Sequence, residues 1–176
     1  GNQLWQTSVG TESDPMRWGS SSSPILLNDL LVVPAGAEAR AVIGLDKNTG
    51  QEKWRADADG LGMVWGTPAV AAADGNPEIV LAAPFEVWAL NPENGKLRWY
   101  CASSEDDQFS SSAVVQDNTV FVLGGRGGGS VAVKAGGKDD VADSHVVWKG
   151  RHNTRFATPI VYDGKLFFVS DGIVTC

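Results

Sequence analysis

Short apolar runs separated by polar turn residues follow one another along the whole chain. Four segments share one plan, in which a turn pair joins two apolar runs: 25–33 (ILLNDLLVV), 69–83, 114–123 and 160–169. Asp74 with Gly75, and Asp163 with Gly164, are strong hairpin signals because these residues adopt the conformations of tight turns. The β-branched and aromatic residues around the turns favour strands over helices. The pattern therefore predicts a hairpin in each segment.

An aromatic residue followed by small hydroxyl residues precedes each hairpin. The four copies are 18–24 (WGSSSSP), 65–68 (WGTP), 109–113 (FSSSA) and 156–159 (FATP), and their last positions are 44, 45 and 46 residues apart. A period of this length with four short strands per unit is typical of β-propeller blades. We expect the serine runs 20–23 and 110–112 to lie at the crowded propeller axis, where their hydroxyl groups can bond backbone groups.

A third element, a turn that ends in tryptophan, is repeated after the hairpins. It reads GLDKNTGQEKW at 44–54 and ALNPENGKLRW at 89–99. Gly50 and Gly95 occupy the turn position that wants a positive φ, which glycine adopts without steric cost. Side chains that can bond the turn's own backbone accompany them, namely Asp46, Thr49 and Asn91. Trp54 and Trp99 are then expected on the outermost strand of each unit, where a large buried indole would cover the seam with the next blade.

The third copy of this element is interrupted. It begins at Ala132, but its tryptophan, Trp148, comes after an insertion of six residues. We expect the polar loop 136–145 to be a solvated insertion on the outer rim.

Both ends of the chain fall inside the repeat. Gly1 and Trp5 have the spacing of Gly50 and Trp54, so residues 1–9 are expected to supply an outermost strand. One interpretation is that the chain is a piece of a longer protein. Another, compatible with it, is that this strand completes the last unit, either in the same chain or in a partner. Of these two we favour a homodimer that forms an eight-bladed ring, because unpaired strand edges associate readily.

The predicted architecture is all-β, with blades of four antiparallel strands. The expected blade boundaries are about 11–56, 57–101, 102–150, and 151–176 together with 1–9. These four repeats form either half of an eight-bladed ring or a four-bladed ring closed by the N-terminal strand.

Composition narrows the classes of partner. The net charge is −7, with no cluster of basic residues, which disfavours nucleic acid. No apolar stretch is long enough to predict a membrane span. Cys101 and Cys176 fit neither a zinc site nor a redox motif, and we expect two free thiols.

The segments 44–54 and 89–99 resemble the tryptophan-docking repeat A-x-D-x-x-T-G-x-x-x-W of the pyrroloquinoline quinone (PQQ) propellers. The resemblance extends over essentially the whole chain. It implies a β-propeller fold and a periplasmic or otherwise extracytoplasmic location. One branch of the superfamily contains quinoprotein alcohol dehydrogenases, which bind PQQ and calcium. The other contains non-enzymatic relatives such as the lipoprotein of the outer-membrane β-barrel assembly machinery, and this chain is most similar to that branch.

The residues associated with dehydrogenase chemistry are not recognisable here. The resemblance implies an adjacent cysteine pair at the quinone, whereas Cys101 and Cys176 are far apart. Asp106, Asp107 and Asn153 offer oxygen atoms for calcium, but no family motif surrounds them. We therefore predict no catalytic residue, no metal ligand and no cofactor. The expected function is a binding or protein-interaction scaffold, and the alternative is a fragment of a PQQ- and calcium-dependent alcohol dehydrogenase.

The loops that enter the innermost strands gather on one face of a propeller. Here they would bring together Arg17, Trp18, Trp65, Arg151 and Arg155, a funnel suited to a protein partner or a small anionic or planar ligand. The alternative is that the aromatic residues of these loops are repeated packing residues near the axis. His152 and the acidic cluster 105–107 are expected to be solvated loop residues, and the glycine-rich run 124–130 is expected to be a flexible loop on the funnel face.

Overall fold

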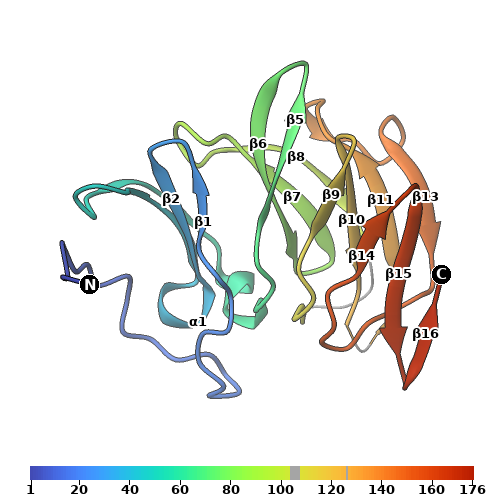
Figure 1. Cartoon of the computed structure of the whole chain (residues 1–176), viewed down its shortest axis with the longest axis horizontal. Coiled ribbons are helices and arrows are strands. Elements are labelled where there is room, and N and C mark those ends of the chain that lie inside the picture. Colours follow the sequence, from blue (N-terminus) through green and yellow to red (C-terminus); the bar gives the residue numbers. More distant parts are fainter. Residues whose placement is uncertain (104–107, 126) are drawn as a thin grey trace.

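The computed structural model describes residues 1–103, 108–125 and 127–176. Four sheets stand side by side in an open arc (Figure 1), and we call them blades 1 to 4. Blade 1 consists of β1 (Ile25–Leu27), β2 (Leu30–Ala35), β3 (Ala41–Asp46) and β4 (Glu52–Asp57). Blade 2 contains β5 (Ala69–Ala73), β6 (Asn76–Ala83), β7 (Glu86–Leu90) and β8 (Leu97–Ala102). Blade 3 contains β9 (Val114–Gln116), β10 (Thr119–Leu123), β11 (Ser130–Lys134) and β13 (Val146–Gly150). Blade 4 contains β14 (Ile160–Tyr162), β15 (Lys165–Ser170) and β16 (Ile173–Thr175).

The predicted hairpins are confirmed. In blade 1, Leu27 at the end of β1 pairs with Leu30 at the start of β2, and the other three blades begin with hairpins of the same kind. The turns use the left-handed conformations that the sequence predicted, with φ of 50° at Asp74 and 79° at Gly75. Two short helices are also present among the described residues: α1 (Gly36–Ala39), and the 3₁₀ turn η1 (Asp59–Met63) between blades 1 and 2.

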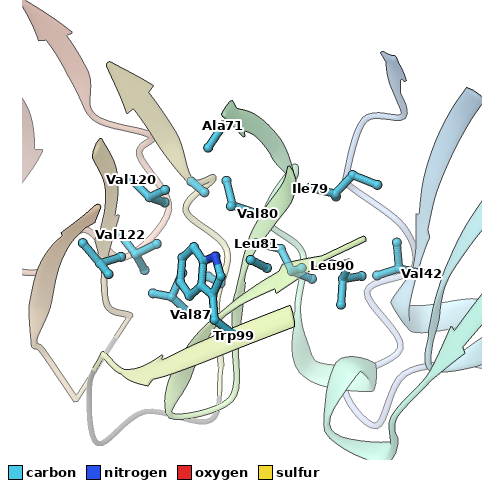
Figure 2. Close-up of a cluster of buried hydrophobic side chains, with 14 of the residues drawn as sticks. Val42, Ala71, Ile79, Val80, Leu81, Val87, Leu90, Trp99, Val120 and Val122 are labelled. Carbon is cyan, nitrogen blue, oxygen red and sulfur yellow. The ribbon is translucent and has the colours of Figure 1, made fainter. Parts of the chain in front are cut away.

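The hydrophobic core lies between the blades. β6 of blade 2 is buried on both faces, with Ile79 toward blade 1 and Val80 toward blade 3 (Figure 2). Trp99 of β8 is fully buried in the same cluster as Val120 and Val122 of blade 3. β6 therefore alternates its apolar residues between the two neighbouring seams, and the sheets on either side exclude water from both of its faces.

The insertion 136–145 corrects one expectation. It is not simply a solvated loop, because it forms β12 (Asp139–Asp140), which pairs in parallel with β8 at Trp99 and Tyr100. Val141, the next residue, is 1% exposed and belongs to the core. The physical reason is that β8 would otherwise present a free edge beside a large indole, and the insertion pairs with that edge.

The N-terminal segment also departs from one of the expected arrangements. Residues 1–9 form no strand, and blade 4 is a sheet of β14, β15 and β16 alone. The four blades therefore do not close into a ring within one chain, and the two termini lie at opposite ends of the arc (Figure 1). Instead, the Thr7 hydroxyl group donates to the Gly50 carbonyl oxygen of blade 1, at 2.8 Å. Among the described residues, none of the helices is long and apolar enough to cross a membrane.

Candidate functional site

Two tryptophans reach from one structural unit to the turn of the next. The Trp5 indole Nε1–H donates to the carbonyl oxygen of Lys47 at 3.0 Å, and the Trp54 indole donates to that of Pro92 at 2.7 Å. Both acceptors occupy the same position in the repeated turn. A Cβ atom placed on Gly95 would lie only 2.5 Å from the Trp54 ring, so the turn glycine is needed for close approach as well as for its φ of 70°.

The predicted side-chain bonds within these turns are present. The Asp46 carboxylate accepts hydrogen bonds from the backbone N–H groups of Asn48 (2.9 Å) and Thr49 (3.1 Å) and forms an ion pair with Lys53 at 3.2 Å. The Asn48 bond, followed by that from Lys53, lowers the pKa of Asp46. In the second copy, the Asn91 side chain accepts from the N–H group of Glu93 at 2.8 Å. Both turns are thus held by their own first polar residue.

Trp99 has a different acceptor, which the sequence analysis missed. Its indole donates at 2.7 Å to the carboxylate of Glu78, a residue of β6 that is 3% exposed. The same carboxylate accepts from the N–H group of Gly136 in the insertion (3.1 Å) and contacts the Arg98 guanidinium (3.4 Å). The sequence could have indicated this role, because Glu78 directly precedes the apolar run of β6, and a buried charge requires partners.

The last tryptophan of the repeat is the least covered. Trp148 of β13 is 37% exposed. Its ring lies 6.2 Å from that of His152 in a stacked arrangement, and His152 in turn lies 5.3 Å from Phe168. His152 is therefore an exposed loop residue, as predicted, that also packs between two aromatic rings.

A series of hydrogen bonds to hydroxyl groups links the segments that precede the innermost strands. The N–H group of Ser23 donates to the Thr67 hydroxyl oxygen (2.9 Å), and that of Thr67 donates to the Ser112 hydroxyl oxygen (3.0 Å). The N–H group of Ser112 donates to the hydroxyl oxygen of Thr158 (3.2 Å). The partners are 44, 45 and 46 residues apart, so each bond connects one blade to the next. Within the predicted serine runs, the Ser112 hydroxyl group satisfies a backbone group as expected, whereas the Ser111 hydroxyl group is buried without a hydrogen-bond partner among the described residues.

The loop that carries Arg17 and Trp18 is shaped by Asp14, a second residue that sequence reasoning missed. The Asp14 carboxylate is almost fully buried and accepts from the backbone N–H groups of Met16, Trp18 and Gly19, at 2.8–3.2 Å. Burial alone raises the pKa of Asp14, but these hydrogen bonds, the one from Gly19 first, outweigh it and lower the pKa overall. The Asp-Pro pair followed by Gly19 was the available signal for such a turn.

The predicted aromatic residues of the loop face divide into two kinds. Trp18 and Phe156 are 53% and 59% exposed, whereas Trp65 and Phe109 are buried. Trp65 supports the exposed residue, since its ring lies 4.9 Å from that of Trp18 and its indole donates to the Gly19 carbonyl oxygen (3.1 Å). The packing interpretation therefore holds for Trp65 and Phe109, and exposed aromatic surface remains at the other two positions.

Two of the predicted funnel residues, Trp18 and Arg155, come together in the structure, and Phe156 joins them. Trp18, Arg155 and Phe156 line one narrow gap, and the Arg155 guanidinium lies 5.4 Å from the centroid of the Phe156 ring. Arg155 and Phe156 also line a cavity of about 490 Å³ with Asn153. Arg151 lies apart from them, beside Lys149, in a second cavity of about 500 Å³. Arg17 lines neither cavity, and its φ of 56° reflects the tight Asp14 turn.

The residues of this chain do not fit a quinone site of the dehydrogenase type. Both cysteines are free, but Cys101 is buried in β8 and Cys176 is exposed after β16, so they form no adjacent pair. Burial raises the pKa of Cys101 to about 11, which keeps it a neutral thiol. Asn153 accepts a hydrogen bond from the Ser170 hydroxyl at 3.0 Å. Within the described part of the chain, no three histidine, cysteine or acidic residues gather as metal ligands, and Asp106 and Asp107 lie outside it with the rest of the cluster 105–107.

Comparison with known proteins decides the family. The family model described as outer membrane protein assembly factor BamB matches residues 1–176, the whole chain. The chain belongs to the BamB family. This confirms the resemblance read from the turn motif. No curated protein matches the chain significantly.

Solved structures share the fold of this BamB-family chain. BamB from Moraxella catarrhalis is similar with a TM-score of 0.60 and 16% identity, over 84% of this chain and 42% of that one. The quinohemoprotein alcohol dehydrogenase ADHIIG from Pseudomonas putida HK5 is similar with a TM-score of 0.53 and 15% identity, over 82% of this chain and 30% of that one. The quinohemoprotein alcohol dehydrogenase from Comamonas testosteroni is similar with a TM-score of 0.54 and 18% identity, over 80% of this chain and 22% of that one. The chain thus spans less than half the length of each of these proteins.

Proposed function

We propose that this chain is part of a BamB-like propeller that serves as a protein-binding scaffold in outer membrane protein assembly, outside the cytoplasm. Its family membership supports this proposal. The observation that carries it is the exposed aromatic and cationic surface formed by Trp18, Arg155 and Phe156 at one narrow gap. Tryptophan and arginine dominate the residues that contribute most to protein–protein affinity.

The way in which Trp18 is held strengthens this interpretation. The Asp14 carboxylate accepts hydrogen bonds from the backbone around Trp18, and the Trp65 ring packs against the Trp18 ring. An exposed indole in a fixed position loses little entropy when a partner covers it. A small anionic ligand at Arg151 and Lys149 is the weaker candidate, because both side chains line an open cavity without an exposed aromatic partner.

Site-specific photocrosslinking tests the proposal. A photoreactive phenylalanine analogue placed at Trp18 is expected to form adducts, in the producing cell, with a component of the outer-membrane assembly machinery. The same analogue at Val147, an equally exposed residue of the outer strand β13, is the matched control. Adducts at position 18 that are no more abundant than those at position 147 would contradict the proposed surface. Dye reduction by alcohols after addition of PQQ and Ca²⁺ would instead favour the dehydrogenase alternative.

We also propose that the indoles act as docking elements between blades and that the open arc is covered by further blades of a second copy. One face of blade 4 supports this, since the strand register places four exposed large apolar side chains on it: Ile160, Tyr162, Val169 and Val174. An apolar surface of this kind on a sheet face is typical of an interface. The measurement is the mass in solution: we expect twice 18.6 kDa, and a clean monomer at high concentration would overturn the homodimer.

A further inference from the structure

The outermost strands of blades 1 and 2 differ in one respect that points to a second binding site. In blade 2, the outer edge of β8 is covered, because β12 pairs with it in parallel. In blade 1, the strand order ends at β4, with no strand beyond it among the described residues. The register of the two blades makes them directly comparable, since Gly44 pairs with Trp54 as Ala89 pairs with Trp99.

The covered edge shows what a fifth strand does in this fold. Asp139 and Asp140 lie opposite Trp99 and Tyr100, and the N–H group of Val141 then donates to the Tyr100 carbonyl oxygen at 3.0 Å. The Val141 side chain enters the seam and is 1% exposed. Three successive residues are therefore enough to pair with the strand edge and to fill the space beside it.

The uncovered edge has an open cavity at the corresponding place. A groove of about 420 Å³ is lined by four consecutive residues of blade 1, Arg55 to Ala58, and its opposite wall is formed by Trp88, Leu90 and the turn 94–97 of blade 2. Ala56 of this groove corresponds in register to Cys101 of β8, which is fully buried in the covered seam together with Val141. The groove is thus the counterpart of the space that the insertion occupies one blade further on.

We propose that the free edge of β4 is a docking site for an extended segment of a partner protein, which adds as a fifth strand parallel to β4. Its first two residues lie opposite Trp54 and Arg55. The N–H group of the third donates to the Arg55 carbonyl oxygen, and the third side chain, β-branched and apolar, enters the groove as Val141 enters its seam. Main-chain bonds give such strand addition its affinity, and side-chain pockets give it its specificity.

This site goes beyond the proposed loop-face function and is separate from it. β4 is the outermost strand of blade 1, whereas Trp18 and Phe156 lie in the loops that precede the innermost strands β1 and β14. A failure of the crosslinking experiment at position 18 therefore leaves the β4 groove standing, and the reverse is also true.

The chain's own insertion supplies the probe. A capped peptide with the sequence of residues 137–143 (Gly-Lys-Asp-Asp-Val-Ala-Asp) is titrated into the folded chain, and backbone and indole chemical shifts are followed by NMR. We expect saturable shift changes at 54–58 and at the Trp88 indole. A second peptide, N-methylated at the valine, lacks the donor and is expected to bind about tenfold more weakly.

Two protein variants sharpen the test. Ala56→Leu fills the groove and is expected to abolish the shift changes, whereas Lys165→Ala on blade 4 is expected to leave them intact. If Ala56→Leu does not fold, the N-methylated peptide still decides. Equal affinity of the two peptides, or no localised shift at millimolar peptide, would overturn the proposal.

Discussion

The seam between blades 1 and 2 and the seam between blades 2 and 3 solve the same packing problem in different ways. In the first, Trp54 lies against a tight glycine turn, donates to a backbone carbonyl oxygen, and leaves a groove beside β4. In the second, the turn is replaced by an insertion, Trp99 donates to a buried carboxylate, and the seam is filled. Both seams therefore contain a buried indole that donates a hydrogen bond, whereas the group that accepts this bond differs between them.

Removing the indoles should have the largest effect. We expect Trp99→Ala to lower the free energy of unfolding by about 4 kcal/mol, because a fully buried aromatic side chain leaves a cavity. Trp54→Ala should cost somewhat less, and Trp148→Ala about 1 kcal/mol or less, since Trp148 is already 37% exposed. Urea unfolding of the three variants measures this order. A loss for Trp148→Ala equal to that for Trp99→Ala would contradict it.

Replacing the turn glycine should break the first seam only. Gly95→Ala adds a Cβ that collides with the Trp54 ring, in addition to the strain of positive φ, so we expect a loss of about 3 kcal/mol. Gly75→Ala is the matched control, because its φ is 79° but no atom lies within 4 Å of the added Cβ. That variant should lose only about 1 kcal/mol. Equal losses, measured by urea unfolding, would show that the contact between indole and turn does not matter.

Replacing the buried acceptor should weaken the second seam. Glu78→Ala leaves the Trp99 and Gly136 N–H groups without their acceptor, and we expect a loss of about 3 kcal/mol. Glu78→Gln keeps an oxygen atom for these donors and should lose about 1 kcal/mol. The indole resonance of Trp99 reports the change directly. If Glu78→Ala is as stable as Glu78→Gln, the carboxylate is not the element that holds this seam.

Lowering the pH should have the smallest effect on the free energy of unfolding, through protonation of Asp46 in the turn of blade 1. The pKa of Asp46 is lowered in the folded chain, so its contribution to stability is complete above its ordinary pKa of 3.8 and is lost as the pH falls through the lower, folded value. Asp46→Asn removes this titration. We expect the difference in urea midpoint between the variant and the parent chain to shrink between pH 6 and pH 3. A difference that is constant over this range would contradict the role of the charge.

The repeated features could be predicted from the sequence because the chain shows each of them more than once. The turn glycines, the outer-strand tryptophans and the hydroxyl residues near the axis recur at one spacing, and the structure places them in equivalent positions. Their roles depend on local geometry, which repetition reveals.

The unrepeated features could not be predicted, since each depends on contacts between distant segments. Glu78 finds its partners in β8 and in the insertion, and only the fold brings these together. Asp14 belongs to an Asp-Pro turn that the other three copies of the aromatic motif lack. Trp18 and Trp65 share one motif, yet only Trp65 is buried. The exposure of the loop face therefore follows from the neighbours of each residue and not from the motif.

Hydrogen exchange of the indole N–H groups, measured by NMR on the intact chain, tests most directly whether the tryptophans fasten the blades. The account predicts slow exchange for Trp54 and Trp99, whose N–H groups are bonded inside the seams, and fast exchange for Trp148. Exchange of Trp54 or Trp99 at the rate of Trp148 would contradict it.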